Sequence, residues 1–156
     1  MPEMRDIAEA AQECTGLSRT VLRYSLEMKR MVDRAKQPGF SVDSWGELAA
    51  YVDTARFIRV GNFKEVMNWD EYIGFLTGWA AHSEWDGSFK RVTENGSTVL
   101  LELEERSRAG DYTSVVNSVS VYEFNGAGKL CHLDIYLQIP MPDPEMLAGY
   151  KDIKIN

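Results

Sequence analysis

The sequence predicts an α+β fold in which a curved antiparallel sheet wraps around helices from the N-terminal part of the chain. Two observations lead to this prediction. Apolar residues in the first third recur at the 3–4 spacing of a helix, whereas most of the second half alternates between apolar and polar residues and is rich in strand formers. Turn motifs separate the alternating stretches, so neighbouring strands can pair antiparallel.

Two helices are expected in the first third, over about residues 4–14 and 18–36. Thr15 and Ser18 are both suitable caps for the second helix, and Pro38-Gly39 ends it. The arginines and lysines of this helix form a basic stripe. Such a stripe is more typical of a solvated helix face than of a docking surface for anions.

Two capping patterns predict shorter helices further along the chain. Ser44 and Glu47 form an S-x-x-E pattern ahead of a short helix that reaches about Tyr51. Asn68 and Glu71 form a similar pattern ahead of another helix. That helix carries an apolar stripe at i, i+3, i+4 and i+7, which is more typical of a core face than of a cofactor site: Tyr72, Phe75, Leu76 and Trp79.

Strands are expected over residues 55–60, 85–94, 98–107, 112–124 and 130–139. Asn95-Gly96 is a strong hairpin signal, because a type I′ turn needs positive φ at both of its central residues. Residues 125–129 form the turn before the last strand. From Pro140 onward, repeated prolines predict an extended tail.

The composition excludes several classes of protein. Of 156 residues, 44% are hydrophobic, which excludes intrinsic disorder. The formal charge is −7, with 24 acidic against 17 basic residues, which argues against nucleic acid as the main partner. No apolar run is long enough to span a membrane and no signal peptide is evident, so we expect a cytoplasmic protein that does not bind membranes.

Cysteine and histidine are too scarce for the usual metal centres. Cys14 and Cys131 are the only cysteines, and we expect both to be free thiols. His82 and His132 are the only histidines, so a histidine-rich metal site is excluded. We expect neither a metal nor a cofactor.

The order of these elements resembles the nuclear transport factor 2-like superfamily, which includes ketosteroid isomerase, limonene epoxide hydrolase, scytalone dehydratase and the SnoaL-type polyketide cyclases. The motif from Phe124 to Leu130 and the strand from Cys131 to Leu137 resemble the last hairpin of ketosteroid isomerase. The resemblance covers about residues 18–139, so we expect an N-terminal helical arm (1–17), a domain of this superfamily (18–139) and a C-terminal tail (140–156).

The resemblance implies a cone-shaped α+β barrel. Its concave sheet face and helices enclose an apolar cavity, and its convex sheet face forms a homodimer. On the last strand, Leu133, Ile135 and Leu137 would face the cavity. His132, Asp134 and Tyr136 would then face outward, although His132 and Asp134 could also be read as an acid–base pair.

The resemblance also points to candidate catalytic residues. Tyr24 is similar in position to the oxyanion-binding Tyr of the isomerase, and its other interpretation is a buried core Tyr. Glu105 falls where limonene epoxide hydrolase has a catalytic Asp. Leu103 and Ile135 stand where that enzyme has its Arg and second Asp, so the resemblance argues against epoxide hydrolysis by that triad.

Arg59 falls near the proton-shuttling Asp of the isomerase. An arginine cannot act as a base at ordinary pH, but it could hold a carboxylate, phosphate or enolate, or pair with Glu105. Ser120 falls where the isomerase has an oxyanion-binding Asp. His82 would lie near the cavity mouth, or else is an exposed His at a helix end. The remaining expected lining residues are Ser118, Tyr122, Leu101, Phe75, Trp79 and Trp85.

Two functions remain open. One is an enzyme that performs cofactor-free isomerisation, dehydration or cyclisation of a hydrophobic cyclic carbonyl compound, with Glu105 as general base or acid. The other is a non-catalytic module for ligand binding or dimerisation, whose cavity holds a ligand or is filled by the aromatic residues Phe57, Phe75, Trp79 and Phe89. Residues 84–139 carry a net charge of −4, with Glu102, Glu104 and Glu105 close together, so the question is whether Glu105 points inward.

Overall fold

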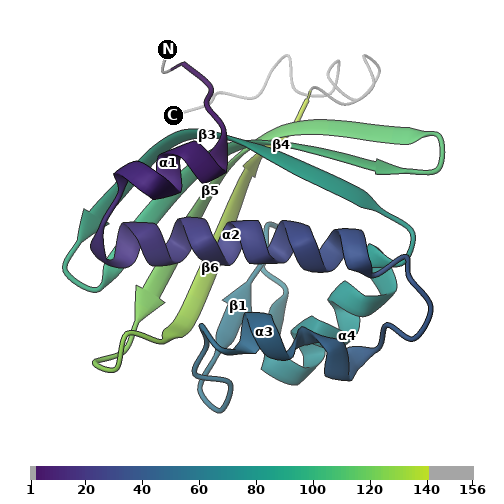
Figure 1. The fold of residues 1–156 in the computed structure, drawn as a ribbon, viewed down its shortest axis with the longest axis horizontal. Coiled ribbons are helices and arrows are strands. Elements are labelled where there is room, and N and C mark those ends of the chain that lie inside the picture. The colour runs from purple at the N-terminus through teal and green to yellow at the C-terminus, as the bar shows by residue number, and fades with distance from the viewer. Residues whose placement is uncertain (1–2, 141–156) are drawn as a thin grey trace, which may run out of the picture.

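The structure is a computed structural model that describes residues 3–140. Six strands form one curved sheet in the order β2-β1-β6-β5-β4-β3, with the helices on its concave side (Figure 1). The expected α+β fold is therefore confirmed. The predicted extended tail, beyond Pro140, lies outside the described residues.

The long strands agree with the sequence pattern to within a few residues. They are β3 (Glu84–Asn95), β4 (Thr98–Ala109), β5 (Tyr112–Phe124) and β6 (Leu130–Gln138), each antiparallel to the next. One face of each strand is buried beneath the helices, because apolar residues alternate with polar ones.

Two short strands extend the sheet beyond β6. β1 (Ile58–Val60) pairs parallel with β6, and β2 (Val66–Asn68) pairs antiparallel with β1. The strand expected over residues 55–60 is thus only three residues long. Its register with β6 places Arg59 opposite Leu133, and both residues line the cavity described below.

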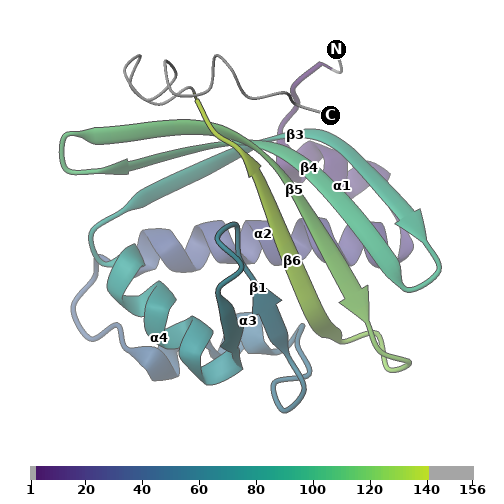
Figure 2. The same cartoon turned by 180° about the vertical axis from the view of Figure 1, so that it is seen from behind.

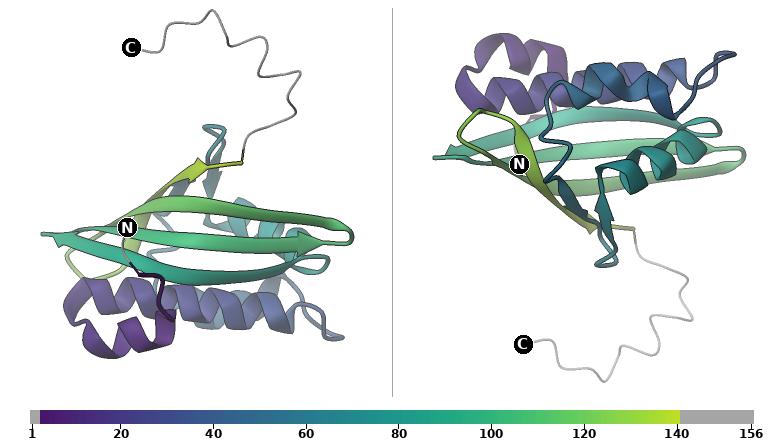
Figure 3. Two further views of the ribbon diagram at one scale, coloured as in Figure 1. Left: turned by 90° about the horizontal axis from the view of Figure 1, so that it is seen from above. Right: turned by 90° about the horizontal axis from the view of Figure 1, so that it is seen from below.

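The first two helices, α1 (Ile7–Glu13) and α2 (Gly16–Arg34), lie across the concave face of the sheet (Figure 3). The second helix begins two residues earlier than expected. Thr15 is at its N-cap but makes no side-chain capping hydrogen bond. Instead, the Glu94 carboxylate from β3 accepts hydrogen bonds from the backbone N–H of Ser18 at 2.6 Å and from its hydroxyl at 2.8 Å.

The capping box predicted at Ser44 and Glu47 is wrong, because Ser41 is the residue that caps this segment. The 3₁₀ helix η1 (Val42–Trp45) is capped by Ser41, and Ser44 is the third residue of that capping box, not the cap of the helix that follows. The short helix α3 (Gly46–Ala49) continues directly from η1.

The second capping pattern is confirmed. The helix α4 (Trp69–Ala80) begins with a capping box in which Asn68 Oδ1 accepts from Glu71 N–H and Glu71 Oε2 accepts from Asn68 N–H, both at 2.9 Å. Trp45 donates its indole N–H to the Thr77 hydroxyl at 2.8 Å, which joins η1 to α4.

The β3–β4 hairpin turns one residue later than predicted. Asn95 pairs with Thr98, so the loop is Gly96-Ser97. Gly96 has φ of +60°, whereas Asn95 and Ser97 do not have positive φ. A glycine alone at the first central position is the pattern of a type II′ turn, so the predicted type I′ turn is wrong.

Two irregularities reset the alternation of the strands. The β3 register shifts between Phe89 and Arg91, which leaves Lys90 without a cross-strand partner. The β5–β6 register shifts so that Phe124 pairs with Leu130 and Cys131 is the extra residue. Cys131 therefore does not continue the inward row that Leu133 begins, although strict alternation along the strand would place the two residues on one face.

No helix within residues 3–140 covers the convex face of β3–β6 (Figure 2). Cys14 and Cys131 are free thiols. Within residues 3–140, no helix is both long and apolar enough to cross a membrane, and no cluster of His, Cys, Asp and Glu side chains is arranged to hold a metal ion.

Candidate functional site

A cavity of about 290 Å³ lies between the concave face of the sheet, α2 and α4. It brings together the three residues expected to be catalytic, Tyr24, Arg59 and Glu105. Most of the expected binding residues line it as well: Ser120, Tyr122, Leu103, Leu133, Ile135, Leu137, Phe75, Trp79 and Trp85.

Glu105 points into this cavity from the middle of β4. Its two neighbours on the strand, Glu104 and Arg106, form an ion pair with each other on the opposite face. Burial raises the pKa of the Glu105 carboxyl above its usual value, and the nearby Ser118 hydroxyl, Trp85 indole and Arg59 charge offset only part of that increase. Of the described residues that line the cavity, only Glu105 carries a carboxylate.

Tyr24 reaches the cavity from α2 and is 4% exposed. Its ring packs edge-to-face against Tyr122 at 5.9 Å between centroids and against Tyr51 at 6.2 Å. Among the described residues, its hydroxyl has no hydrogen-bond partner. Burial raises the pKa of Tyr24 well above its usual value, so the hydroxyl remains a donor at neutral pH.

Arg59 enters the cavity from β1, and its side chain is 12% exposed. Its Nη1 lies 3.3 Å from Glu65 Oε1 and its Cζ lies 5.0 Å from the centre of the Tyr72 ring, a cation–π geometry. Its Nε is buried without a partner among the described residues. The ion pair of Arg59 is therefore with Glu65, and the alternative of a pair with Glu105 is wrong.

Three expected lining residues lie elsewhere. Leu101 is fully buried in the core behind the cavity wall. Ser118 is buried on the inward face of β5, close to Glu105, but does not line the cavity. His82 is exposed in the turn after α4, because the chain leaves the helix toward solvent before β3 begins.

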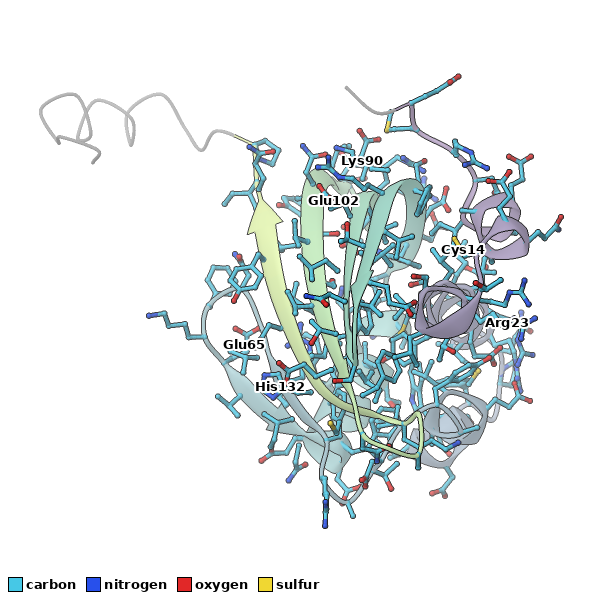
Figure 4. The ribbon with its side chains drawn as sticks, turned by 90° about the vertical axis from the view of Figure 1, so that its left-hand side faces the viewer. Cys14, Arg23, Glu65, Lys90, Glu102 and His132 are labelled. Atoms are coloured by element: carbon cyan, nitrogen blue, oxygen red, sulfur yellow. The ribbon has the colours of Figure 1, made fainter. Side chains whose placement is uncertain are left out.

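The acid–base interpretation of His132 and Asp134 is also wrong for this cavity. Their side chains are 2.9 Å apart, Nε2 to Oδ1, on the opposite side of β6 from Leu133 and Ile135. Figure 4 shows His132 and Glu65 at the β6 side of the molecule, away from Cys14, which follows α1, and from Arg23 on α2. Strand alternation, with a buried Leu133, decides which face is inward.

Sequence reasoning missed part of the lining. Ser25 and Met28 come from α2, and Tyr72 and Leu76 come from α4. A signal was available on each helix. Met28 is four residues after Tyr24, and Tyr72 and Leu76 belong to the same helical stripe as Phe75 and Trp79, which were expected to line the cavity.

Phe57, Phe75, Trp79 and Phe89, the aromatic residues that could have filled the cavity, divide into two groups. Phe57 and Phe89 are buried in the core. Phe75 and Trp79 line the cavity, and Phe75 is half-exposed at its edge. The cavity is thus lined, not filled, by aromatic rings.

A wider depression of about 610 Å³ lies at the end of β3–β5 beside α2, but its charged groups already pair with one another. Arg108 pairs with Glu84, Arg106 with Asp86, and Lys29 with Asp33. The smaller cavity combines burial with polar groups that lack partners, so it is the better candidate site.

No protein-family model matches this chain, and no curated protein matches it in sequence. Solved structures do match. A nuclear transport factor 2-like protein of unknown function from Burkholderia pseudomallei K96243 superposes with a TM-score of 0.59 at 13% identity, covering 80% of this chain and 92% of that chain. One from Exiguobacterium sp. 255-15 gives 0.58 at 11% identity, covering 74% and 98%.

An LEH-like epoxide hydrolase from M. tuberculosis gives a TM-score of 0.53 at 14% identity, covering 72% of this chain and 84% of that chain. Identities this low establish the fold and leave the chemistry to the site itself. The helices packed in the concave face of a six-stranded curved sheet, together with these superpositions, show that this chain has the nuclear transport factor 2-like fold.

Proposed function

We propose that this protein is a cofactor-independent enzyme that transfers a proton on a hydrophobic cyclic carbonyl compound, with Glu105 as the general base and acid. The observation that carries the proposal is the carboxyl of Glu105 inside a cavity, with a pKa that burial raises. A carboxyl with a raised pKa both accepts and returns a proton efficiently near neutral pH.

Two other polar groups in the cavity, Tyr24 and Arg59, are suited to stabilise the negative charge that develops in such a reaction. Glu105 takes a proton from the carbon next to the carbonyl. The electrons of the broken C–H bond form a carbon–carbon double bond, the carbonyl π electrons move to the oxygen, and an enolate results. Tyr24 is a buried hydroxyl donor and Arg59 is a buried cation, and both line the same cavity. Donors in a site of low dielectric stabilise a developing oxyanion more strongly than water does.

Isomerisation, dehydration and cyclisation all begin or end with this proton transfer. Epoxide hydrolysis by a carboxylate–arginine–carboxylate triad is not proposed, because Leu103 and Ile135 supply aliphatic groups to the lining. One of the similar structures is nevertheless an LEH-like epoxide hydrolase. The same fold therefore serves as the scaffold of an enzyme in that protein.

The proposal can be tested without knowing the product. A panel of cyclic ketones and enones is incubated with the protein in D₂O, and loss of the α-proton signal is followed by ¹H NMR. We expect catalysed exchange with the wild-type protein and a loss of about 10²-fold or more with Glu105→Gln. Glu104→Gln is the matched control, because Glu104 is adjacent but lies on the other face of β4.

Exchange that persists undiminished in Glu105→Gln would contradict the assignment of the base. The second candidate is a non-catalytic binding or dimerisation module, and the cavity volume, near the lower end for ligand sites, is compatible with it. Compounds that shift the NMR signals of cavity residues but never exchange faster than in buffer would favour that module.

A further inference from the structure

Arg59 is a buried cation whose hydrogen-bonding capacity is largely unused. A guanidinium carries five N–H donors in a planar fork and keeps its charge at any ordinary pH. Among the described residues, its ion pair is a single contact of 3.3 Å with Glu65, and its buried Nε has no partner. A bidentate carboxylate would instead make two shorter, parallel bonds.

Only one carboxylate oxygen of Glu65, Oε1, contacts Arg59. Its other oxygen, Oε2, accepts a hydrogen bond from the backbone N–H of Phe63 at 2.8 Å. Burial raises the pKa of the Glu65 carboxyl, but its backbone hydrogen bonds and Arg59 outweigh that effect, so its pKa is lowered. Glu65 therefore stays ionised and holds one end of the guanidinium, while the Nε side is not satisfied.

A second donor in the same cavity also lacks a partner. The Tyr24 hydroxyl is buried, and no described residue accepts from it. Leaving a buried donor unpaired is destabilising, because the group loses its hydrogen bonds to water and gains none in return. Two such donors in one cavity are complementary to a ligand that supplies acceptor oxygens, and the charge and planarity of Arg59 favour an anionic planar group over a neutral carbonyl.

We propose that the cavity recognises a compound that carries a carboxylate, and that Arg59 binds this carboxylate through the Nε side of its fork. The inference rests on the proposed function and narrows its substrate class to a cyclic carbonyl compound with a carboxylate group. The apolar lining from β6, Leu133, Ile135 and Leu137, would contact the ring. Arg59 is then a specificity-determining residue that separates acids from neutral ketones.

The test compares pairs of ligands that differ only in charge. Benzoate and cyclohexanecarboxylate are titrated against benzamide and cyclohexanecarboxamide by isothermal calorimetry at constant ionic strength, with the full-length protein. We expect each carboxylate to bind at least about tenfold more tightly than its amide, since a charged hydrogen bond contributes about 1.5–3 kcal/mol. Equal affinities within each pair overturn the inference.

Variants then locate the binding group. We expect Arg59→Gln to reduce carboxylate affinity by about tenfold or more while amide affinity changes little. Arg59→Lys retains the charge without the fork and should give intermediate affinity. Arg56→Gln is the matched control, because it removes one positive charge from an exposed position in the preceding turn.

Two further measurements distinguish a failure of this inference from a failure of the proposed function. Inorganic phosphate that binds as tightly as the carboxylates and competes with them would show a general anion site, which overturns the assignment to carboxylates. Glu105→Gln should retain carboxylate binding and lose exchange. If the protein catalyses exchange but binds carboxylates no more tightly than amides, this inference alone is refuted. If it prefers carboxylates but exchange does not depend on Glu105, the assignment of Glu105 as the base alone is refuted. If Arg59→Gln does not fold, the affinities of the wild-type protein for the ligand pairs, together with those of Arg59→Lys, still test the inference.

Discussion

The Glu65 carboxylate occupies the space that a Cβ on Gly61 would need, and Arg59 Nη1 lies 2.7 Å from the same point. The chain turns back at Gly61, where the Gly61 N–H donates to the Glu65 carbonyl at 2.9 Å and Lys64 takes a φ of +61°. The absence of a side chain at Gly61 is therefore what allows Glu65 to reach Arg59.

Gly61→Ala should displace the Glu65 carboxylate and break its contact with Arg59. We expect the free energy of unfolding to fall by about 1 kcal/mol, the scale of a partly buried ion pair. Urea denaturation measures the loss. Glu65→Gln should give a similar loss, and the double variant should be no worse than either single one, because both changes remove the same contact. Fully additive losses would contradict this relationship.

Glu105 should make the stability of the protein depend on pH. Its pKa is raised in the folded protein, so the folded state binds the proton more tightly than the unfolded state. Stability therefore falls as pH rises from the unfolded pKa through the folded pKa. Glu105→Gln removes this loss.

The gain in unfolding free energy from Glu105→Gln, relative to wild type, should thus be larger at about pH 7.5 than at about pH 4. Denaturation at both pH values checks the sign. Glu104→Gln serves as the control, because Glu104 is ion-paired on the other face of β4. A gain that does not change with pH would show that Glu105 titrates normally.

Gly96→Ala should destabilise the β3–β4 hairpin. Gly96 has φ of +60°, a conformation that costs an L-residue about 1–2 kcal/mol. Gly126→Ala is the matched control, since Gly126 also lies in a hairpin loop but lacks positive φ, and nothing lies within 4 Å of its added Cβ. Thermal or urea denaturation should separate the two variants. Equal stability would contradict the turn assignment.

We also propose that the convex sheet face forms a homodimer. Val115 is 50% exposed and Tyr136 is 60% exposed on this face, and Val119 lies directly across from Tyr136. Tyr136→Glu should convert a dimer to a monomer in light scattering at micromolar concentration. Val42→Glu is the control, because Val42 is similarly exposed but lies on the helical side. A wild-type monomer would refute the proposal.

Local patterns were sufficient for much of the fold. The α4 capping box at Asn68 and Glu71 was predicted from residues three positions apart, and those residues make both of its hydrogen bonds. The alternation of the long strands was enough to set Glu105 on the opposite face from Glu104, and to separate Leu133 from His132. These features depend on side chains within a few positions of one another, which is the range that sequence periodicity reports.

Other features depend on contacts that are distant in sequence. The Glu94 carboxylate of β3 accepts a hydrogen bond from the backbone N–H of Ser18 near the start of α2, and no local capping pattern indicates this contact. The extra residue at Lys90 and the shift of the turn to Gly96-Ser97 follow from how whole strands pair. The inward position of Arg59 follows from the three-residue pairing of β1 with β6.

The sequence by itself determined the α+β class, the order of the elements and the placement of Glu105 on the opposite face of its strand from Glu104, because each follows from the spacing of neighbouring residues. That this face of the strand is the inward one was decided by the tertiary structure. Only the tertiary structure decided that Arg59 pairs with Glu65 and not with Glu105, that His82 stays in solvent, and that Tyr24 and Arg59 share one cavity with unpaired donors. Those outcomes depend on the packing of α2, α4 and the β1–β2 loop against the sheet. Such packing is fixed by long-range contacts that no short stretch of sequence contains.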